Sequence, residues 1–532
     1  MRRLIGLPLL VLCLACTQAG SAIADPYPVT NTSDSGEGSL RAAIVAANAH
    51  DGADTIPIEV TGTIELQSAL QIIFSPVEIV GPGAPQLEVR RSAVAGFSIF
   101  AISADTGPSS ITGLTVSNGG GTLAGEFALG GGVRNGEGSL TLTGVVVRDN
   151  EAKAEAGTNA RAEGGGIYSE GPLTLRESVI VENTARASGG SSETWAFGGG
   201  VAALGTLTVE ASTISGNVSE ATGGGTRAVA QGGGLVAGVG VAIERSTISG
   251  NTVKAAGAAS QVRSQGGGVQ MNDGTLTSST VSGNSAISAD EARSANLHAG
   301  GIGSDLILAR NTIVANPLGD ANSCDVGGLN TLFSGGFNLD EDGSCEFDEG
   351  SDLNGVAAGL DPVLKDNGGP TPTHALLEGS IAIDRGNSFS ASSDQRGLPR
   401  PADFPAISNK EGGDGSDIGA FELQVPPGAA VPPLPPILVG PEPGDRTPPK
   451  TRIVSGPARV GYERKAKFRF NSSEAQSSFK CKLDKKKWKK CRSPYKLKVK
   501  PGKHLFKVRA IDRFGNADPS PARFSWRVKP VG

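Results

Sequence analysis

Short runs of alternating apolar and polar residues recur through the middle of the chain. One set consists of Leu-Thr-Leu-type pieces at 140–142, 173–175 and 207–209, and a piece of the Ser-Thr-Ile type follows each of them. Alternation with a period of two, in pieces rich in Thr, Val and Ile, predicts β-strands. We expect a third short strand directly after each glycine triplet of the repeat.

Two markers repeat in phase with these strands. Gly-Gly-Gly triplets begin at residues 130, 164, 198, 232 and 266, and a degenerate version, Ala299-Gly300-Gly301, follows. An asparagine closes each Ser-Thr-Ile-type piece at offsets of 32 to 34 residues: Asn118, Asn150, Asn183, Asn217, Asn251, Asn284 and Asn316. A helical-hairpin repeat has the same period, but a glycine triplet is very unfavourable inside a helix. The repeat therefore predicts one coil of a β-solenoid for about every 34 residues.

Strands of such a solenoid pair only with the same strand of the next coil, in parallel and about 4.8 Å apart. Inward Leu, Val and Ile then form one long core, and the seven asparagines are predicted to stack as a structural ladder of hydrogen-bonded amides. The remaining 10 to 14 residues of each coil, such as 151–163, are predicted to form an Ala/Gly/Thr-rich loop. Less regular coils are expected on both sides, at 61–118 and 302–422.

A helical pattern at 38–48 is well placed to cap the open N-terminal end of the solenoid. Its apolar face comprises Leu40, Ala43, Ile44 and Ala47. The segment resembles the CSLREA motif of secreted bacterial β-helix proteins, which are similar to polymorphic outer-membrane proteins. Gly38 stands where that motif has cysteine, and Ala42 stands where it has glutamate.

Residues 361–422 carry a series of short motifs. They are Asp361-Pro362, Gly-Pro-Thr-Pro-Thr-His-Ala-Leu at 369–376, Ala-Ile-Asp-Arg-Gly at 382–386, Asp-Gln-Arg-Gly at 394–397 and Asp-Ile-Gly-Ala-Phe-Glu at 417–422. The series resembles the choice-of-anchor Q domain, which ends many exported right-handed β-helix proteins. The two resemblances imply an exported, right-handed parallel β-helix of the pectin-lyase-like kind over 25–424, with the choice-of-anchor-Q-like end at 302–424. They imply an architecture and no particular reaction.

A proline-rich linker is predicted at 425–446. Ten prolines lie between Pro426 and Pro449, and polyproline II geometry would make this stretch a semi-rigid spacer. The glycine repeat stops before the linker and the composition changes after it, so a separate domain is expected at 447–532.

Residues 447–532 alternate again in several short pieces, such as 466–470 and 505–510, with turn signals between them. This pattern predicts a small β-sandwich. The motifs Phe479-x-Cys481-x-Leu483 and Arg509-Ala510-x-Asp512 resemble bacterial immunoglobulin-like repeats of surface proteins. The predicted fold class is therefore all-β, with a right-handed parallel β-helix followed by an immunoglobulin-like β-sandwich.

Charge divides the chain at the linker. Residues 25–446 hold 21 Lys+Arg against 48 Asp+Glu, whereas residues 447–532 hold 25 against 5. Candidate polyanion-binding residues lie in the lysine-rich run 480–500: Lys485, Lys486, Lys487, Lys489, Lys490 and Arg492. Because like charges at this density repel one another, an anionic wall or surface polymer, lipid phosphate or nucleic acid would stabilise them. The alternative is a solvated strand face that only increases solubility.

The N-terminus has the features of a secretory signal over residues 1–24. Two arginines precede an apolar segment, 4–16, that is too short to span a bilayer, and Ala22-Ile23-Ala24 is a cleavage site of the A-x-A kind. Cleavage would leave Asp25 as the N-terminus. The alternative is a lipoprotein acylated at Cys16. Both readings predict a secreted or surface-associated protein, and no other apolar run is long enough to span a membrane.

Four cysteines follow the predicted signal, and an even number in an exported chain predicts disulfides. The pairs Cys324–Cys345 and Cys481–Cys491 are favoured because the linker separates them. Four reduced, buried cysteines are the alternative. A zinc site is disfavoured because the chain has no C-x-x-C spacing.

The sequence predicts no catalytic residue, cofactor or metal ligand. None of the four histidines, His50, His298, His374 and His504, has an obvious serine or carboxylate partner in the sequence, and His374 is expected to be a packed, structural residue. One acidic cluster comprises Asp340, Glu341, Asp342, Asp348, Glu349 and Asp352. Such oxygens suit Ca²⁺, although the spacing of the helix–loop–helix calcium motif is missing, and a solvated acidic turn is the alternative.

The leading hypothesis is an exported, non-enzymatic surface or cell-wall-associated protein. A β-helix would display its loops, and the basic domain would attach it to an anionic wall or surface polymer, with glycans and nucleic acid as further candidate partners. The alternative is a carbohydrate-active enzyme, a polysaccharide lyase or glycoside hydrolase of the same fold. A groove with three or more converging carboxylates would favour the enzyme.

Overall fold

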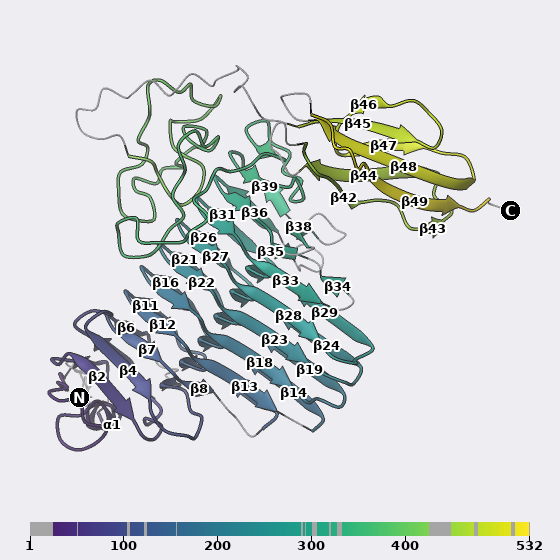
Figure 1. Ribbon diagram of the computed structural model, residues 1–532. Helices are drawn as coiled ribbons and strands as arrows, with labels where there is room; N and C mark the ends of the chain where they lie inside the picture. Colours follow the sequence, from purple (N-terminus) through teal and green to yellow (C-terminus); the bar gives the residue numbers. More distant parts are fainter. Residues whose placement is uncertain are drawn as a thin grey trace, which may run out of the picture.

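The computed structural model shows a parallel β-solenoid followed by a C-terminal β-domain (Figure 1). The structure describes residues 25–50, 52–103, 107–121, 125–155, 157–288, 291–292, 294–299, 306–318, 321–326, 332–424, 448–472, 477–511 and 516–530. The predicted all-β class and parallel solenoid are confirmed. The predicted signal at 1–24 and linker at 425–446 lie outside the described residues. Among the described residues, no helix is long and apolar enough to cross a bilayer.

Three parallel sheets enclose the solenoid core, and each coil contributes one strand to each of them in turn. Sheet I contains β5 (Phe100–Ile102), β10 (Val133–Asn135), β15 (Ile167–Ser169), β20 (Val201–Ala203), β25 (Leu235–Ala237), β30 (Val269–Met271), β35 (Ser294–Ala299) and β38 (Asn322–Val326). Sheet II contains β1 (Asp54–Pro57), β3 (Val77–Val80), β6 (Ser109–Thr112), β11 (Leu140–Thr143), β16 (Leu173–Arg176), β21 (Leu207–Glu210), β26 (Val241–Glu244), β31 (Gly274–Thr277), β36 (Ile307–Arg310) and β39 (Leu332–Ser334). Sheet III contains β2 (Gly62–Leu66), β4 (Leu87–Arg91), β7 (Thr115–Ser117), β12 (Val146–Arg148), β17 (Val179–Val181), β22 (Thr213–Ser215), β27 (Thr247–Ser249), β32 (Thr280–Ser282), β37 (Ile313–Ala315), β40 (Leu339–Asp340) and β41 (Leu353–Asn354).

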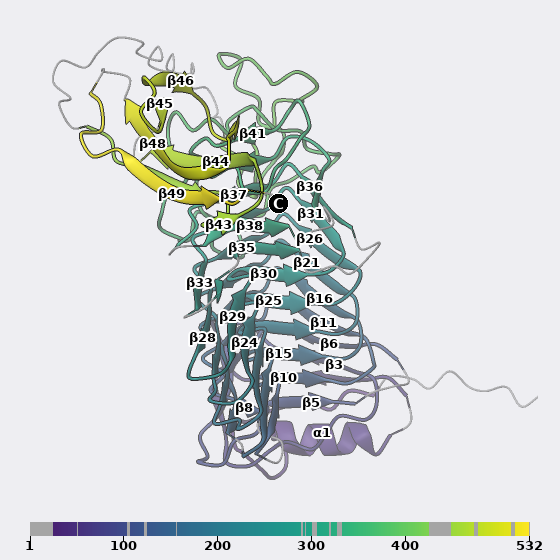
Figure 2. The ribbon, with the colours of Figure 1, turned by 90° about the vertical axis from the view of Figure 1, so that its right-hand side faces the viewer.

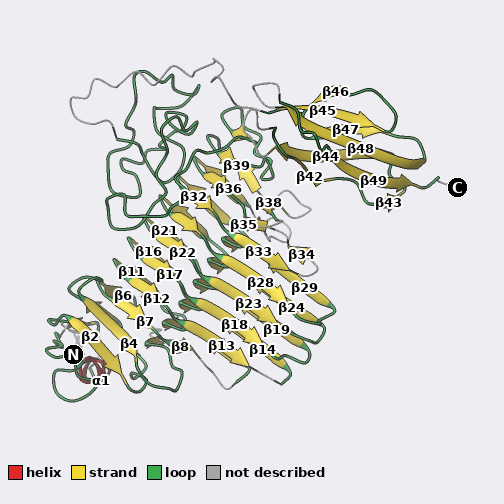
Figure 3. Cartoon of the chain, in the orientation of Figure 1, coloured by secondary structure: helices red, strands yellow, loops and turns green. Residues whose placement is uncertain are grey.

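The segments predicted as loops, such as 151–163, are strands, and this prediction is wrong. Each leaves sheet III in one strand and returns to sheet I in another, so that two further sheets form a fin on the side of the solenoid (Figure 3). The outgoing strands are β8 (Gly120–Gly121), β13 (Glu151–Glu155), β18 (Thr184–Ser188), β23 (Val218–Thr222), β28 (Thr252–Ala256) and β33 (Ser285–Ser288). The returning strands are β9 (Phe127–Leu129), β14 (Asn159–Glu163), β19 (Glu193–Phe197), β24 (Arg227–Gln231), β29 (Gln261–Gln265) and β34 (Glu291–Ala292).

Alanine explains how the two fin sheets pack. Their inward positions form a separate core that is almost entirely alanine, such as Ala152, Ala162 and Ala196, all fully buried. Outward side chains of the outgoing strands form ion pairs between neighbouring coils: Arg186 contacts both Glu151 and Glu220, and Lys254 also contacts Glu220. Segments of low intrinsic β-propensity therefore form strands here, because their small inward methyl groups pack between the two sheets and their outward side chains form ion pairs.

The glycine triplets form the corner between the fin and sheet I. The first glycine of each has positive φ, for example +62° at Gly164, which glycine adopts at little cost. A Cβ at Gly165 would lie 2.3 Å from the carbonyl oxygen of Gly199 in the next coil, so a side chain would clash with backbone there. Gly165 N–H donates to the oxygen of Gly198 at 3.0 Å, which stacks the glycine triplets as predicted. The prediction of a degenerate triplet starting at Ala299 is wrong, because Ala299 lies in β35 opposite Met271 and Gly267 N–H bonds the carbonyl oxygen of Ser294 instead.

A buried ladder of asparagine amides runs along the axis. The Nδ2 of each residue donates to Oδ1 of the next at 2.9 Å from Asn150 through Asn183, Asn217 and Asn251 to Asn284. The same amides accept backbone N–H groups of the preceding coil, for example Asn183 N to Asn217 Oδ1 at 3.0 Å. Side chains thus satisfy polar backbone groups inside the solenoid.

The ladder prediction is wrong for Asn118 and Asn316. Strand register aligns them with Asp149 and Gly283, one position before the ladder, and both have positive φ, 52° and 48°. Asn118 is exposed, and the amide that continues the ladder after Asn284 belongs to Asn296, at 2.9 Å. The 32-residue offsets of the two outer asparagines, one or two residues shorter than the others, were the signal of this shift.

A single helix, α1 (Leu40–Asn48), covers the N-terminal end of the stack (Figure 2). Ser39 caps it by accepting a hydrogen bond from the N–H of Ala42, and its apolar face is buried as the sequence predicted. Gly38 has φ +75°, and a Cβ there would lie 2.3 Å from Thr30 Oγ1. The helix therefore closes the open edge of the first coil.

Residues 355–424 do not extend the stack, contrary to the prediction of further coils up to 422. The coils end at β41, and these residues, here called the strap, fold back over the outer face of sheet III. Gln395 bonds Thr213 at 2.9 Å and Thr247 at 2.6 Å, and the N–H of Ala420 donates to Thr280 Oγ1 at 3.1 Å. The strap therefore joins successive coils and buries threonines that would otherwise face solvent.

The C-terminal domain is a two-sheet β-structure. One sheet contains β42 (Thr451–Ser455), β44 (Lys465–Ser472) and β47 (Tyr495–Lys498). The other contains β43 (Val460–Gly461), β49 (Ala522–Val528), β48 (Gly502–Ile511), β45 (Ser478–Leu483) and β46 (Lys489–Cys491). An aromatic core lies between the sheets, with Phe468 stacked on Phe506 at 4.0 Å and Trp526 beside them.

Candidate functional site

Strand alternation brings cations together on the outer faces of both sheets of the C-terminal domain. Along β48, Phe506 and Val508 point into the core, so the residues between them point outward. We call the outer face of the sheet β43-β49-β48-β45-β46 the basic face. Its cations are Lys480, Lys482, Lys490, Lys503, Lys507, Arg509, Arg523 and Arg527.

The cations of the basic face lie opposite one another on neighbouring strands. Lys480 lies between Lys490 and Arg509, and Lys507 lies between Lys482 and Arg523. Like charges directly opposite destabilise a sheet by about 0.2–1 kcal/mol per pair. The domain therefore retains an arrangement that costs folding stability and that bound anions would relieve.

Carboxylates of the described part of this domain do not neutralise the basic face. Its ion pairs use other side chains: Arg469 and Lys467 contact Glu346 of the solenoid, and His504 contacts Asp484 at 2.9 Å. Burial lowers the pKa of His504, but hydrogen bonds to Asp484 and to the Lys500 carbonyl outweigh that effect and raise it. Arg509 lies over the ring of Trp488 at 4.8 Å.

The structure divides the six residues predicted to bind polyanions. Lys490 belongs to the basic face, whereas Lys489 lies opposite Cys481 and on the other side of its strand. The turn between β45 and β46 holds Lys485, Lys486 and Lys487, all exposed, and Arg492 is exposed just after β46. The prediction missed the cations of β48 and β49, whose two-residue spacing within alternating strands was the available signal.

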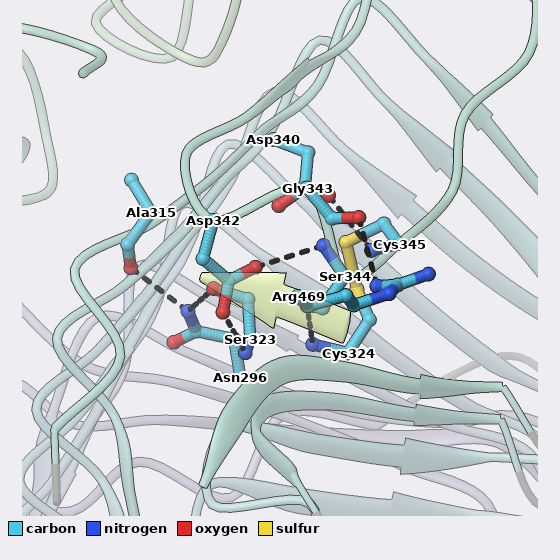
Figure 4. The surroundings of a disulfide bond; sticks show 10 residues. All are labelled: Asn296, Ala315, Ser323, Cys324, Asp340, Asp342, Gly343, Ser344, Cys345 and Arg469. Atoms are coloured by element: carbon cyan, nitrogen blue, oxygen red, sulfur yellow. Dashed lines mark hydrogen bonds between the residues drawn. A yellow bond between two sulfur atoms is a disulfide. The ribbon is translucent and has the colours of Figure 1, made fainter. Parts of the chain in front are cut away.

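Both disulfides join the cysteines that the sequence paired. The Cys481–Cys491 bond links β45 to β46 and keeps Lys490 beside Lys480. The Cys324–Cys345 bond lies at the C-terminal end of the solenoid (Figure 4). Each disulfide therefore lies within one of the two domains.

Carboxylate oxygens of the acidic cluster around Cys345 accept hydrogen bonds from backbone amides. Asp340 Oδ2 accepts the N–H of Cys345 at 2.7 Å, and Asp342 accepts those of Ser323 and Ser344 at 2.9 and 3.0 Å. Burial, and then the neighbouring Asp342, hold the pKa of Asp340 well above its usual range. Within the described ranges, no group of three or more His, Cys, Asp or Glu is arranged to hold a metal ion.

The same region contacts the C-terminal domain. Arg469 donates to the carbonyl oxygen of Gly343 at 3.2 Å and pairs with Glu346, next to the disulfide (Figure 4). A cavity of about 500 Å³ lies between the two domains and is lined by both acids and bases, including Asp325 and Lys465. The sheet that carries β44 thus faces the solenoid, and the basic face belongs to the opposite sheet.

Three carboxylates converge inside the strap, but all are sealed from solvent. Asp417 accepts the N–H groups of Asp384 and Leu423 at 2.9 and 2.6 Å, and Glu422 pairs with Arg400 at 2.7 Å. Burial raises the pKa of Asp417 and of Glu422, and it raises the pKa of Asp384 to about 7. The motif residues of the strap therefore form a buried ion network that holds its fold.

His374 also has a structural position. Its Nε2 lies 2.7 Å from Ser249 Oγ, and its Nδ1 lies 2.7 Å from the carbonyl oxygen of Asp361. Both side chains are only 5% exposed, and burial lowers the pKa of the imidazole. A serine–histidine contact enclosed between the strap and β27 leaves no room for a substrate, so it serves to fasten the strap.

Comparison with known proteins adds little. No protein-family model matches the chain, and no curated protein matches it. One solved structure with some likeness is the catalytic unit of the thermostable GH87 α-1,3-glucanase from Streptomyces thermodiastaticus strain HF3-3. It is 16% identical with a TM-score of 0.18, covering 60% of this chain and 69% of that one. At this level the likeness supports no inference about function.

Proposed function

We propose that the protein is an exported, non-enzymatic attachment protein whose basic face binds an anionic polymer of the cell wall or cell surface. The two disulfides are compatible with export, because disulfides persist in oxidising compartments. The solenoid is then the displayed part, and its fin presents an outer surface with ion pairs between coils and the ring pair Trp195–Phe197.

The observation that carries the proposal is the cross-strand pairing of cations on the basic face. Lys482, Lys507 and Arg523 lie side by side on three neighbouring strands, with no carboxylate among their strand partners. A polymer with a charge on each repeating unit neutralises several such cations at once. Multiple weak ion pairs of this kind depend on salt, since the Debye length falls to about 3 Å near 1 M.

The test is cosedimentation of the full-length secreted protein with isolated bacterial wall across a salt series. The basic-face variant K482Q/K507Q/R523Q should lose at least about tenfold in affinity, because it removes three adjacent charges. The turn variant K485Q/K486Q/K487Q removes the same charge from the exposed turn and should lose less. A control variant, K465Q/K496Q/K498Q, changes the opposite sheet and should bind like the unmodified protein.

Two results would contradict the proposal. Equal losses in all three variants would mean that net charge alone matters, and retention that ignores salt would place attachment elsewhere. A parallel series with duplex DNA separates the polymers: tighter binding to DNA than to wall at the same salt would replace the wall polymer by nucleic acid.

A further inference from the structure

An aspartate occupies a core position at the N-terminal edge of the solenoid. Strand β1 alternates so that Asp54 and Ile56 both point inward, and Asp54 is only 1% exposed. A buried carboxylate is costly unless a cation or several hydrogen-bond donors compensate it. Yet Asp54 Oδ2 has no hydrogen-bond partner among the described residues.

Two groups approach the other oxygen of this carboxylate. His50 Nδ1 lies 3.0 Å from Asp54 Oδ1, and the same imidazole lies 3.4 Å from the carboxylate of Asp25 through Nε2. The backbone nitrogen of Asp25 lies 3.3 Å from Asp54 Oδ1. In the unprocessed chain that nitrogen is an amide with one hydrogen and no charge.

Asp25 is also the residue that the sequence predicts as the N-terminus after cleavage at Ala22-Ile23-Ala24. Hydrolysis of the Ala24–Asp25 peptide bond consumes one water and leaves a carboxylate on Ala24 and an amine on Asp25. The amine takes up a proton, and an α-ammonium is charged near neutral pH. Cleavage thus changes a neutral donor into a cation at 3.3 Å from a buried carboxylate.

We propose that the α-ammonium of processed Asp25 forms an ion pair with the buried carboxylate of Asp54, so that removal of the signal completes the N-terminal edge of the solenoid. The following backbone is already in place to hold this end: Thr55 N–H donates to the Asp25 carbonyl at 3.1 Å, and Tyr27 N–H donates to Thr55 at 2.9 Å. The ammonium has three hydrogens, so it satisfies the carboxylate better than the single amide hydrogen.

The first test identifies the N-terminus and the state of its amine. Intact-mass and N-terminal sequencing of the full-length secreted protein should find Asp25. Reductive methylation at neutral pH should modify this α-amine at least about tenfold more slowly in the folded protein than in the unfolded chain, because the paired amine is held against a carboxylate. A chain that begins elsewhere, including at acylated Cys16, or an amine that reacts at the unfolded rate, would overturn the proposal.

The second test separates charge pairing from crowding. A Gly-Ser-Gly extension before Asp25 moves the ammonium roughly 10 Å away and restores an amide at its place. Amide exchange at Thr55 and Tyr27 should become at least about tenfold faster in the extended protein, since breaking the pair with the buried carboxylate frees this edge. In the Asp54→Asn background the same extension should have no further effect. An equal effect of the extension in both backgrounds would show that it acts by bulk, and no effect in either would show that the pair is absent.

Discussion

Replacing Asn217 by alanine tests whether the amide ladder holds the coils in register. Asn217 is fully buried in the middle of the ladder. Its Oδ1 accepts from both N and Nδ2 of Asn183, at 3.0 and 2.9 Å. Its Nδ2 donates to Oδ1 of Asn251 and to the carbonyl oxygens of Ile180 and Ser215 at 2.9 to 3.0 Å.

The expected loss can be worked from these contacts. Asn217→Ala leaves the backbone N–H of Asn183 buried without an acceptor, at a cost of about 1–3 kcal/mol. The other partners keep one contact each: Ser215 O still accepts Glu182 N–H, and Asn251 Oδ1 still accepts the backbone N–H of residue 217. The Asn217 Nδ2 has two hydrogens for its three acceptors, so roughly three further bonds are lost at about 0.5–1.5 kcal/mol each, and the free energy of unfolding should fall by about 2.5–7.5 kcal/mol.

Asn118→Gly is the matched control. Asn118 is exposed, lies outside the ladder and has φ +52°, which glycine adopts without strain. Its side chain donates one hydrogen bond, to the Arg91 carbonyl, so its loss should cost less than about 1 kcal/mol. Urea unfolding monitors both variants, and hydrogen exchange monitors the amide of Asn183. The reasoning fails if the two variants shift the midpoint equally, or if the Asn183 amide stays protected in Asn217→Ala.

Two further predictions concern the strap and the solenoid end. Burial raises the pKa of Asp384 to about 7, above its usual value near 3.9, so the folded strap holds a proton between those values. Stability should therefore fall as pH rises from 4 to 7, and Asp384→Asn should flatten that dependence in urea midpoints measured across pH. Replacing Cys324 and Cys345 by serine removes a cross-link of 21 residues and should lower the free energy of unfolding by about 3 kcal/mol, measured by urea unfolding without reductant so that Cys481–Cys491 stays intact.

Repetition made the solenoid predictable from sequence. The Leu-Thr-Leu pieces pair in the register that their spacing implies, with Leu140 against Leu173 and Leu173 against Leu207. An error in one coil is corrected by the phase of the others, and the asparagine ladder was wrong only where the phase changed, at Asn118 and Asn316. The capping helix α1 was also predictable from the sequence, because its four apolar residues have helical spacing.

The fin and the strap were missed for physical reasons. Segments such as Glu151–Glu155 alternate correctly, but their inward residues are alanines, whose low β-propensity hides a strand until a facing sheet buries them. The strap has no strand or helix period, and its fold depends on long-range contacts such as Gln395 with Thr213. Contacts between residues about 180 positions apart leave no local pattern to find.

The sequence predicted part of the candidate site. The lysine-rich run predicted a positively charged surface, but composition alone does not show whether a given lysine lies in a turn or on the face of a sheet. Lys485, Lys486 and Lys487 dominate the sequence, whereas the structure gathers Lys482, Lys507 and Arg523 from three strands far apart in the chain. Pairing between strands, which brings like charges into direct opposition, became visible only once the register was known.

The outer cations of the two sheets of the C-terminal domain have different surroundings. Both carry cations on their outer faces, but β44 contributes Lys467 and Arg469 to Glu346 at the solenoid end, where a carboxylate relieves part of their repulsion. The basic face belongs to the other sheet, and of its cations only Arg527 lines the cavity beside that contact. Residues 25–446 hold 48 Asp and Glu residues, which could compete with an anionic polymer for the cations of the C-terminal domain. Glu346 pairs with cations of the β44 sheet, so it does not compete with a polymer bound to the basic face. Charge separation along the chain therefore fits the proposed attachment through one sheet and the proposed display through the solenoid.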